Sequence, residues 1–248
     1  MKLNFTGFSD PGLVRSNNQD AYYIDPEGRF FIVADGMGGH AGGEEASRIA
    51  TREIQAYLEN NWQSSESSQE LLAQALWRAN EAILQDQQNY PERADMGTTA
   101  VVVVFRAPES PWCAHVGDSR LYRFRESRLE QITEDHTWVA RAIKLGDITF
   151  DEARIHPFRH VLSRCLGRED LHQIDVQPLD VKVGDLLLLC SDGLTEELAD
   201  QNITDCLKEN YLVEKAVYSL VEAAKAQGGH DNITVAIVAV EDTSQNSQ

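Results

Sequence analysis

Four strongly apolar segments of this chain each carry an aspartate at one end. Asp35 closes FFIVAD, Asp118 follows WCAHVG, Asp192 follows LLLLCS, and Asp231 precedes NITVAIVAV. Apolar runs of this kind are typical of buried strands. Three of the acids lie at carboxyl ends and one lies at an amino end, so an antiparallel sheet would bring all four carboxylates to the same rim.

Carboxylates gathered at one rim repel one another, by about 1–4 kcal/mol per pair at effective dielectric constants of ~80 to ~20. A divalent cation is the natural counter-charge, because no basic residue adjoins Asp35, Asp192 or Asp231 in the sequence. Oxygen ligands without cysteine or paired histidine favour Mg²⁺ or Mn²⁺. A single Asp-Gly or Asp-Ser pair is more typical of a turn, so the inference depends on the four acids together.

A glycine-rich stretch from Gly36 to Gly43 follows Asp35, and five of its eight residues are glycine. Glycine permits close backbone approach and positive φ angles. We therefore expect the Gly36 carbonyl to bind a metal beside Asp35, with the loop wrapped around the site. The stretch also fits the dinucleotide pattern G-x-G-x-x-A, but that motif is weak alone, and no parallel βαβ unit surrounds it here.

The spacing of apolar residues along the chain predicts the helices and strands that must position these acids. Apolar residues recur at helical spacing in three segments. Strand-like runs follow one another as hairpins, which favours antiparallel pairing, and VVVV without polar alternation indicates a strand buried on both faces. The expected helices cover 44–58, 71–83 and 213–226, and the expected strands cover 29–34, 98–105, 112–117, 120–125, a piece near 129, 171–178, 186–190 and 232–240.

The composition excludes several classes of function. The chain has 248 residues and a formal charge of −18, so it lacks the basic surface that nucleic acids or anionic membranes require. Its length and 42% hydrophobic content fit one domain. Its four cysteines are widely spaced, and no apolar run approaches the ~20 residues of a membrane span. We therefore expect a reduced, soluble, cytoplasmic protein.

Six motifs occur in order between about Asp10 and Val240: R-x-x-N-x-D, ADGMGGHAGGEEAS, MGTTAV, AHVGDSRLY, SDGLTEEL and GGHDNITV. Together they closely resemble the metal-dependent protein serine/threonine phosphatases of the type 2C class, the PPM family, and especially its compact bacterial members. The resemblance implies an α+β fold: a four-layer αββα sandwich of two mostly antiparallel sheets flanked by helices, with a flap insertion at about 136–168. It makes 1–241 a single phosphatase domain and leaves 242–248 as a polar tail.

The resemblance also assigns roles to the acids already singled out. It implies that Asp35 bridges two metal ions, that the Gly36 carbonyl binds one of them, and that Asp192 and Asp231 complete the binuclear site. Asp20 would hold metal-bound water. The two ions would lower the pKa of a bridging water molecule, which attacks phosphorus in line without a covalent enzyme intermediate.

Two further residues complete the implied site. Asp118, with Asp192, matches a third metal site of bacterial members. Arg15 matches the arginine that binds the phosphate, a role suited to its planar fork of donors. The implied catalytic residues are therefore Arg15, Asp35 and Asp192.

Two positions depart from the pattern of other members. Met37 stands where eukaryotic members carry a histidine that can protonate the leaving alkoxide, which leaves the general acid open. His40 could serve, but a histidine in a glycine loop is more often structural, and we favour metal-bound water. Gln19 stands where other members often have glutamate, so Asp20 is the nearby acid.

The flap segment carries a net positive charge within an acidic chain. Its six cations outnumber its three acids, whereas the whole chain carries −18. Such a charge run can be a solvated helix face. By resemblance it lies beside the active site, and we expect its charge and His160 to help bind phosphorylated protein. The cations are Arg141, Lys144, Arg154, Arg159, Arg164 and Arg168.

The leading hypothesis is an active Mg²⁺- or Mn²⁺-dependent phosphatase acting on phosphoserine and phosphothreonine, with phosphotyrosine left open. A binding module that keeps the fold without catalysis is one alternative, although such proteins usually lack the metal acids. A metal-dependent nuclease is another, which the acidic balance disfavours. The expected partners are phosphorylated proteins, with the nitrogen-signalling protein PII as a candidate, and we expect a monomer.

Overall fold

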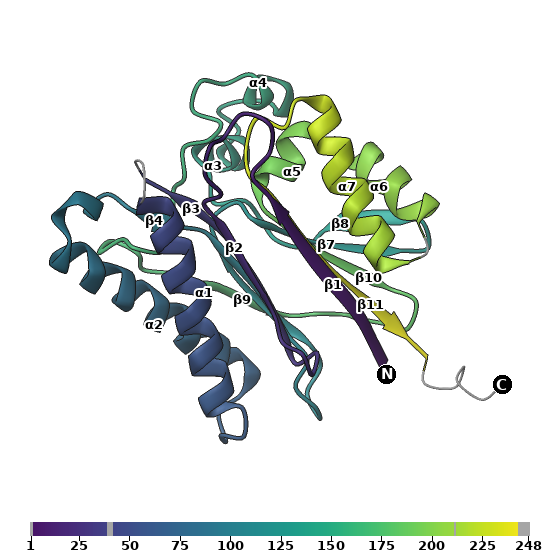
Figure 1. The fold of residues 1–248 in the computed structure, drawn as a ribbon, viewed down its shortest axis with the longest axis horizontal. Coiled ribbons are helices and arrows are strands. Elements are labelled where there is room, and N and C mark those ends of the chain that lie inside the picture. Colours follow the sequence, from purple (N-terminus) through teal and green to yellow (C-terminus); the bar gives the residue numbers. More distant parts are fainter. Residues whose placement is uncertain (1, 39–41, 211, 243–248) are drawn as a thin grey trace.

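The computed structural model describes residues 2–38, 42–210 and 212–242. Two sheets lie face to face between two layers of helices (Figure 1). The first sheet has the strand order β2-β3-β5-β6-β9, with β4 paired to β3, and the second has the order β1-β11-β10-β7-β8. Every strand pairing is antiparallel. The predicted α+β sandwich of four layers is confirmed.

The first sheet is built around the apolar strands that follow Arg29 and Thr99. Its strands are β2 (Asp20–Ile24), β3 (Phe30–Met37), β4 (Gly97–Thr98), β5 (Ala100–Val104), β6 (Trp112–Val116) and β9 (Asp175–Pro178). All five residues of β5 are buried, which confirms the prediction for VVVV. Val102 packs toward the helices, whereas Val101 and Val103 pack toward the second sheet.

The second sheet brings together the two ends of the chain. Its strands are β1 (Lys2–Asp10), β7 (Arg120–Arg125), β8 (Arg128–Gln131), β10 (Leu186–Cys190) and β11 (Ile233–Glu241). The N-terminal strand β1 pairs with β11 along its whole length, from Lys2 opposite Glu241 to Asp10 opposite Ile233. The core between the sheets includes Phe31, Leu189 and Val238, each fully buried.

Helices cover the outer face of each sheet (Figure 1). The two long helices α1 (Gly42–Asn61) and α2 (Ser68–Asn89) pack on the first sheet, and α5 (Asp192–Glu197), α6 (Asp200–Glu209) and α7 (Val213–Gln227) pack on the second. Ser67 begins α2 with a capping box that it shares with Glu70, so the serine-rich break has a defined structure. None of the described helices is long and apolar enough to cross a membrane.

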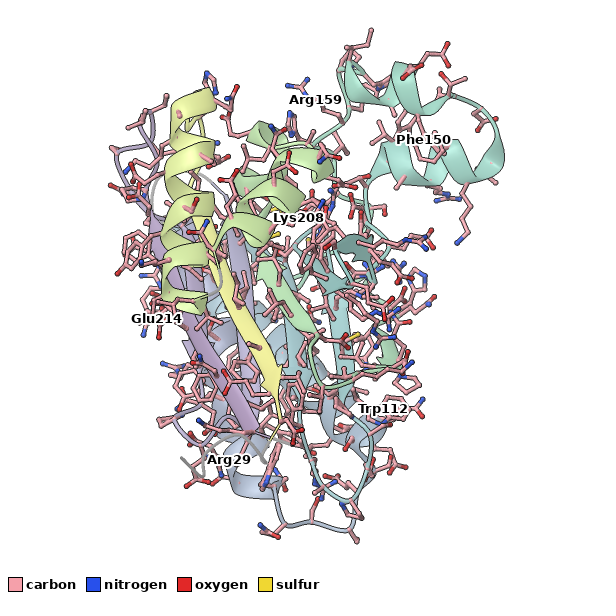
Figure 2. All side chains as sticks on the ribbon, turned by 90° about the vertical axis from the view of Figure 1, so that its right-hand side faces the viewer. Arg29, Trp112, Phe150, Arg159, Lys208 and Glu214 are labelled. Carbon is pink, nitrogen blue, oxygen red and sulfur yellow. The ribbon has the colours of Figure 1, made fainter. Side chains whose placement is uncertain are left out.

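The predicted insertion forms two short helices, α3 (Trp138–Leu145) and α4 (Phe150–Arg154), and they project from one end of the sandwich in Figure 2, where Phe150 and Arg159 are labelled. Thr137 and Thr149 accept hydrogen bonds that begin α3 and α4. Gly146, with φ of 79°, ends α3 in a left-handed conformation that glycine adopts without strain. Local capping therefore shapes this segment.

Several elements were not anticipated from the sequence. Strand β1 alternates polar and apolar residues weakly, β2 has only five residues, α5 has only six, and α6 lies in a polar stretch. A short turn, η1 (Pro91–Arg93), leads into β4. Of the predicted polar tail, residues 243–248 lie outside the described part of the chain, as does His40 in the gap 39–41.

Candidate metal centre and active site

One end of the sandwich gathers the aspartates singled out from the sequence. Asp35 lies near the end of β3, Asp118 directly after β6, Asp192 directly after β10, and Asp231 just before β11. In the first sheet Asp35 pairs with Asp20, and in the second sheet Cys190 pairs with Val235. Antiparallel register therefore places strand ends and strand beginnings at the same rim, as predicted.

These side chains line a cleft of about 610 Å³. Asp35, Gly36, Asp118, Asp192 and Asp231 all contribute to its wall. Arg15 and His160 also line it, from the N-terminal loop and from the flap. The structure thus brings the predicted site residues together. Asp20 is not among the residues that line the cleft, but it is paired with Asp35 across β2 and β3.

Hydrogen bonds hold the backbone of Asp35 from both sides. Its amide donates to Thr99 Oγ1 at 3.0 Å, while its carbonyl accepts from the Thr99 amide at 2.9 Å and from Thr98 Oγ1 at 2.8 Å. Thr99 Oγ1 is also 2.6 Å from Ser119 Oγ. Both threonines are buried. They leave the Asp35 carboxylate free to face the cleft, a role that the motif MGTTAV did not reveal from sequence alone.

Asp20 is held behind the cleft with one oxygen unsatisfied. Its Oδ2 atom accepts hydrogen bonds from Ser191 Oγ at 2.7 Å and Thr234 Oγ1 at 2.6 Å. Its Oδ1 atom is buried and has no hydrogen-bond partner. A buried carboxylate oxygen without a donor is costly, so the site calls for a water molecule or a cation at this position. Burial raises the pKa of Asp20 to about 7, against the hydrogen bonds that lower it.

The neighbouring acids are destabilised in the same way. Burial, then the charges of Asp20 and Asp192, raise the pKa of Asp35 well above its usual value. Burial, then the charge of Asp192, raise the pKa of Asp118 well above its usual value. The ionised form of each acid is disfavoured relative to its protonated form, because the other acids lie close to it and solvent is largely excluded. A positive charge in the cleft would reverse this balance.

The donor set fits divalent cations of the hard class. The cleft offers carboxylate oxygens and the Gly36 peptide, and no cysteine is among its lining residues. A Cβ atom at Gly36 would lie 2.0 Å from the Gly43 carbonyl oxygen, so only glycine lets the chain pass here. The predicted reason for the glycines was that the loop wraps a bound ion. The observed reason is close contact between Gly36 and the start of α1.

Among the described residues, Arg15 is the one arginine that forms a hydrogen bond with a predicted metal ligand. Its Nη2 donates to Asp231 Oδ2 at 2.7 Å. The guanidinium side chain is half exposed, at 51%, so the pair is open to solvent and is a weak interaction. This contact could not be found from the basic residues next to each aspartate in the sequence, because the two residues are 216 positions apart. Arg15 therefore lies at the mouth of the cleft with donors that can reach an anion.

The family model for protein phosphatase 2C matches residues 14–232, which is most of the chain and includes all of these site residues. The chain belongs to the protein phosphatase 2C family. The predicted resemblance is thereby confirmed.

Curated members of the protein phosphatase 2C family match almost the whole chain. The serine/threonine protein phosphatase PstP of Mycobacterium tuberculosis is 37% identical over 243 residues, which are 97% of this chain and 45% of PstP. The chain thus spans less than half the length of that relative. Protein phosphatase PhpP of Streptococcus pneumoniae is 35% identical over 236 residues, covering 94% of this chain and 95% of PhpP.

Solved structures of the protein phosphatase 2C family have the same fold. The catalytic domain of PstP in complex with two manganese ions superposes with a TM-score of 0.83 at 34% identity, covering 97% of this chain and 99% of that domain. The PstP/Ppp phosphatase of Mycobacterium tuberculosis superposes with a TM-score of 0.85 at 36% identity, covering 97% of this chain and 99% of that one.

Glu196 is a candidate site residue that sequence reasoning missed. Within the described residues, His160, Asp192 and Glu196 offer ligand atoms that lie within 4.8 Å of one another. His160 Nδ1 contacts Glu196 Oε1 directly. Partial burial, then the charges of Asp192 and Asp231, raise the pKa of Glu196 to about 8. Glu196 occurs in the motif SDGLTEEL, but only the short helix α5 turns it toward Asp192.

Asn232 is a second residue of the protein phosphatase 2C site that the sequence did not single out. Its Oδ1 atom accepts from the Gln19 amide at 2.7 Å, and its Nδ2 atom donates to the carbonyls of Pro11 and Asn17 at 3.0 and 2.9 Å. The side chain is 4% exposed. Asn232 therefore ties the loop that carries Arg15 to the strand next to Asp231.

The departures from the family pattern keep their predicted positions. Met37, the position at which a histidine was expected from eukaryotic members, lines the cleft. Gln19 also lines it, and its side-chain amide donates to the Gly38 carbonyl at 3.3 Å, which is a structural contact. His40 lies outside the described residues.

Proposed function

We propose that this chain is a metal-dependent protein phosphatase that hydrolyses phosphoserine and phosphothreonine in proteins, and that it acts in bacterial signalling. The observation that carries the proposal is one cleft in which four aspartates from distant strands converge, with Arg15 at its mouth. The names of the family members PstP and PhpP support the activity. The manganese-bound relative supports divalent metal dependence.

We assign the metal ligands residue by residue. Asp35, the Gly36 carbonyl, Asp192 and Asp231 would hold two Mg²⁺ or Mn²⁺ ions, and Asp118 with Asp192 would hold a possible third. When bound, such ions lower the pKa of water and neutralise charge on phosphoryl oxygens. The orphaned Oδ1 atom of Asp20 is placed to accept a hydrogen bond from a water molecule at the edge of the site.

The other residues of the cleft bind and orient the substrate. Arg15 exchanges its exposed contact with Asp231 for the phosphate, because a dianion offers a guanidinium two acceptor oxygens. Thr98 and Thr99 hold the backbone of Asp35 by hydrogen bonds, which keeps its carboxylate at the cleft. No serine, cysteine or histidine of the cleft is needed as a nucleophile, since hydrolysis proceeds by direct attack of water in this scheme.

One experiment separates the proposed function from its alternatives. The purified chain is assayed on a phosphothreonine peptide, a phosphotyrosine peptide, a nucleotide and single-stranded DNA, each with Mn²⁺, Mg²⁺ or EDTA. We expect release of phosphate from the phosphothreonine peptide with either metal and none with EDTA. Cleavage of DNA would instead identify a nuclease, and peptide binding without turnover would identify a non-catalytic module.

The flap and His160 form our proposed docking region for the phosphoprotein. His160 lines the cleft from the flap, and the exposed cations Arg141 and Arg159 lie on the same segment. The relation of Arg159 to the body of the protein is visible in Figure 2. Long-range attraction to an acidic phosphoprotein raises the rate of association, so these charges suit a protein substrate.

Removing this charge is expected to affect large substrates selectively. Arg141→Ala with Arg159→Ala should lower kcat/KM for an acidic phosphoprotein by about three- to tenfold at low salt. Turnover of p-nitrophenyl phosphate should stay unchanged. Arg52→Ala with Arg78→Ala, two exposed arginines of α1 and α2, is the matched control. Equal losses on both substrates, or equal effects of the two pairs, would remove the flap from the docking region.

The remaining parts of the proposal concern substrate, domain and location. The nitrogen-signalling protein PII, in its phosphorylated form, is a candidate substrate by family resemblance and can be added to the same assay. Residues 1–241 are proposed as one catalytic domain with its flap at about 136–168, acting as a monomer. The unpaired cysteines Cys113, Cys165, Cys190 and Cys206 suit the reducing cytoplasm.

A further inference from the structure

Two buried histidines lie where the flap joins the body of the protein. His115 in β6 and His136, which precedes α3, are each 2% exposed. Their rings stack with centroids 4.5 Å apart and planes 25° apart. With Asp175 of β9 they form a group whose ligand atoms lie within 4.8 Å of one another, outside the cleft described above.

His136 holds the Gly117 peptide at two points. The Gly117 amide donates to His136 Nδ1 at 3.1 Å, and the His136 amide donates to the Gly117 carbonyl at 3.0 Å. Gly117 has φ of 105°, and a Cβ atom there would lie 2.5 Å from Thr99 Cγ2. The peptide that directly precedes Asp118 is therefore fixed between His136 and the threonine that holds the backbone of Asp35.

The opposite edge of the His136 ring is tied to the far end of the flap. His136 Nε2 lies 3.2 Å from Asp175 Oδ2, and Arg164 Nη1 donates to Asp175 Oδ1 at 2.8 Å. The His136 carbonyl accepts from the Ser163 amide at 2.8 Å. Both ends of the flap thus meet at His136, which also holds the turn before Asp118.

The hydrogen bonds define the protonation of the His136 ring. Burial, then His115 and Arg164, lower the pKa of His136 to about 4, so the ring is neutral near pH 7. Its Nδ1 atom accepts from Gly117, so the proton resides on Nε2 and is donated to Asp175. An Nε2 atom that carries a proton has no lone pair for a metal. His136 therefore acts through hydrogen bonds.

We propose that His136 is a positioning residue that fixes the Gly117 peptide, and through it the direction of Asp118, and that couples this turn to the root of the flap. The inference rests on the proposed function in one respect, the role of Asp118 as a metal ligand. If the proposal holds, a conformational change in the flap alters the orientation of Asp118 through the hydrogen bonds of His136. The bonds at Gly117 and Asp175 occupy the two ring nitrogens separately, so they can be removed separately.

A pair of substitutions tests the Gly117 bond. In His136→Asn the amide oxygen occupies the place of Nδ1 and keeps an acceptor for Gly117. In His136→Gln the amide reaches the place of Nε2, so Asp175 keeps its partner while the Gly117 amide loses its own. Hydrogen exchange of the Gly117 amide, measured without metal, is expected to be faster by on the order of tenfold in the Gln variant and within about twofold of wild type in the Asn variant.

Metal binding provides the second readout. Calorimetric titration with Mn²⁺ alone, without substrate, should show the step that Asp118→Ala abolishes. That step should weaken by on the order of tenfold in His136→Gln, as for other groups that orient a ligand, and stay near wild type in His136→Asn. The remaining steps should be unchanged, which a general loss of structure would not produce.

Further variants test the bond between His136 and Asp175, and check that the effects do not come from loss of folding. Asp175→Ala removes the carboxylate that keeps the proton on Nε2, so the His136 ring can carry its proton on Nδ1 instead and lose the acceptor for Gly117. Exchange at Gly117 should therefore be faster in Asp175→Ala, as in His136→Gln, but not when Asp175→Ala is combined with His136→Asn, whose amide oxygen accepts in either case. The double variant His136→Gln with Asp118→Ala should bind Mn²⁺ as Asp118→Ala does. Thermal unfolding of each variant shows whether it is folded. A wild-type protein without any Mn²⁺ step would refute the proposed function. Asn and Gln variants that behave alike at Gly117 would refute the inference.

Discussion

Asp35→Asn is expected to lower phosphatase turnover by roughly three orders of magnitude or more, while the variant stays folded. Asp35 is the acid that we assign to both ions of the pair, and the charge stabilisation that such ions supply is worth several kcal/mol, at 1.36 kcal/mol for each factor of ten. The measurement is phosphate release from a phosphothreonine peptide at saturating Mn²⁺. Turnover within about tenfold of wild type would reject the assignment.

The same substitution should stabilise the protein when no metal is present. In the folded chain the Asp35 carboxylate is raised in free energy by burial and by Asp20 and Asp192, as the upward shift of its pKa shows. An amide of the same shape carries no charge and avoids that repulsion. The free energy of unfolding in EDTA should therefore rise, whereas the stabilisation by Mn²⁺ should disappear.

Asp25 is the matched control for this substitution. Asp25 is fully buried, whereas Asp35 is partly exposed at the cleft. Asp25 accepts hydrogen bonds at 2.9 and 2.6 Å from the Arg29 guanidinium, which lower its pKa against the effect of burial. Asp25→Asn leaves Arg29 without its counter-charge and should lower the stability of the folded protein, with turnover kept in the molecules that remain folded. The two substitutions should thus change the free energy of unfolding in opposite directions, and only Asp35→Asn should lower turnover. Equal signs would show that the acids of the rim are structural.

The second large effect is expected in the pH dependence of stability. Between pH 3.8 and about 7, folded Asp20 binds a proton that the unfolded chain releases, because its pKa is about 7 in the folded chain and 3.8 in its ordinary environment. Asp35 and Asp118 shift in the same direction. Lowering the pH through this range therefore stabilises the metal-free protein, by an amount of order several kcal/mol.

Comparison of metal-free and Mn²⁺-loaded protein isolates this contribution. His136, with a folded pKa of about 4, acts in the opposite direction below its usual value of 6.5, but it does so in both forms. Binding of Mn²⁺ requires the carboxylates to be ionised, so the difference in unfolding free energy between the two forms should grow from pH 5 to pH 8. At metal concentrations near 100 Kd the difference should approach about 2.7 kcal/mol per site.

Urea unfolding at several pH values, with EDTA or with Mn²⁺, measures this difference. Turnover should fall to background in EDTA and return when Mn²⁺ is added back. Parallel stability curves for the two forms would contradict a metal site made of these acids. They would mean that the carboxylates are ionised without help from a cation, through partners that the structure does not show.

The sequence predicted the strands correctly where a continuous apolar run is fully buried in the fold. The strands at 29–34, 98–105 and 186–190 were predicted within a few residues, because continuous apolar runs have few alternatives to a buried strand. The rim position of Asp35 and Asp192 followed from those strands. Strand β1 was missed because its side chains are only partly buried and its pairing with β11 joins the two ends of the chain.

Contacts between distant residues account for what sequence reasoning missed in the site. Glu196 faces Asp192 through a six-residue helix that shows no periodicity, and Asn232 bonds to a loop more than 200 positions away. The salt bridge between Arg15 and Asp231 is of the same kind. None of these contacts leaves a pattern along the chain.

By itself the sequence determined which residues are candidates for the chemistry: the aspartates at strand ends, the glycines that follow Asp35, and the motifs of the protein phosphatase 2C family. Only the tertiary structure decided which of them touch, which oxygen of Asp20 lacks a partner, and how His136 joins the flap to the turn before Asp118. The physical reason is the separation along the chain of the residues that interact. Hydrophobic periodicity acts over neighbouring residues, whereas hydrogen bonds and charge repulsion depend on distances that only the packed sheets establish.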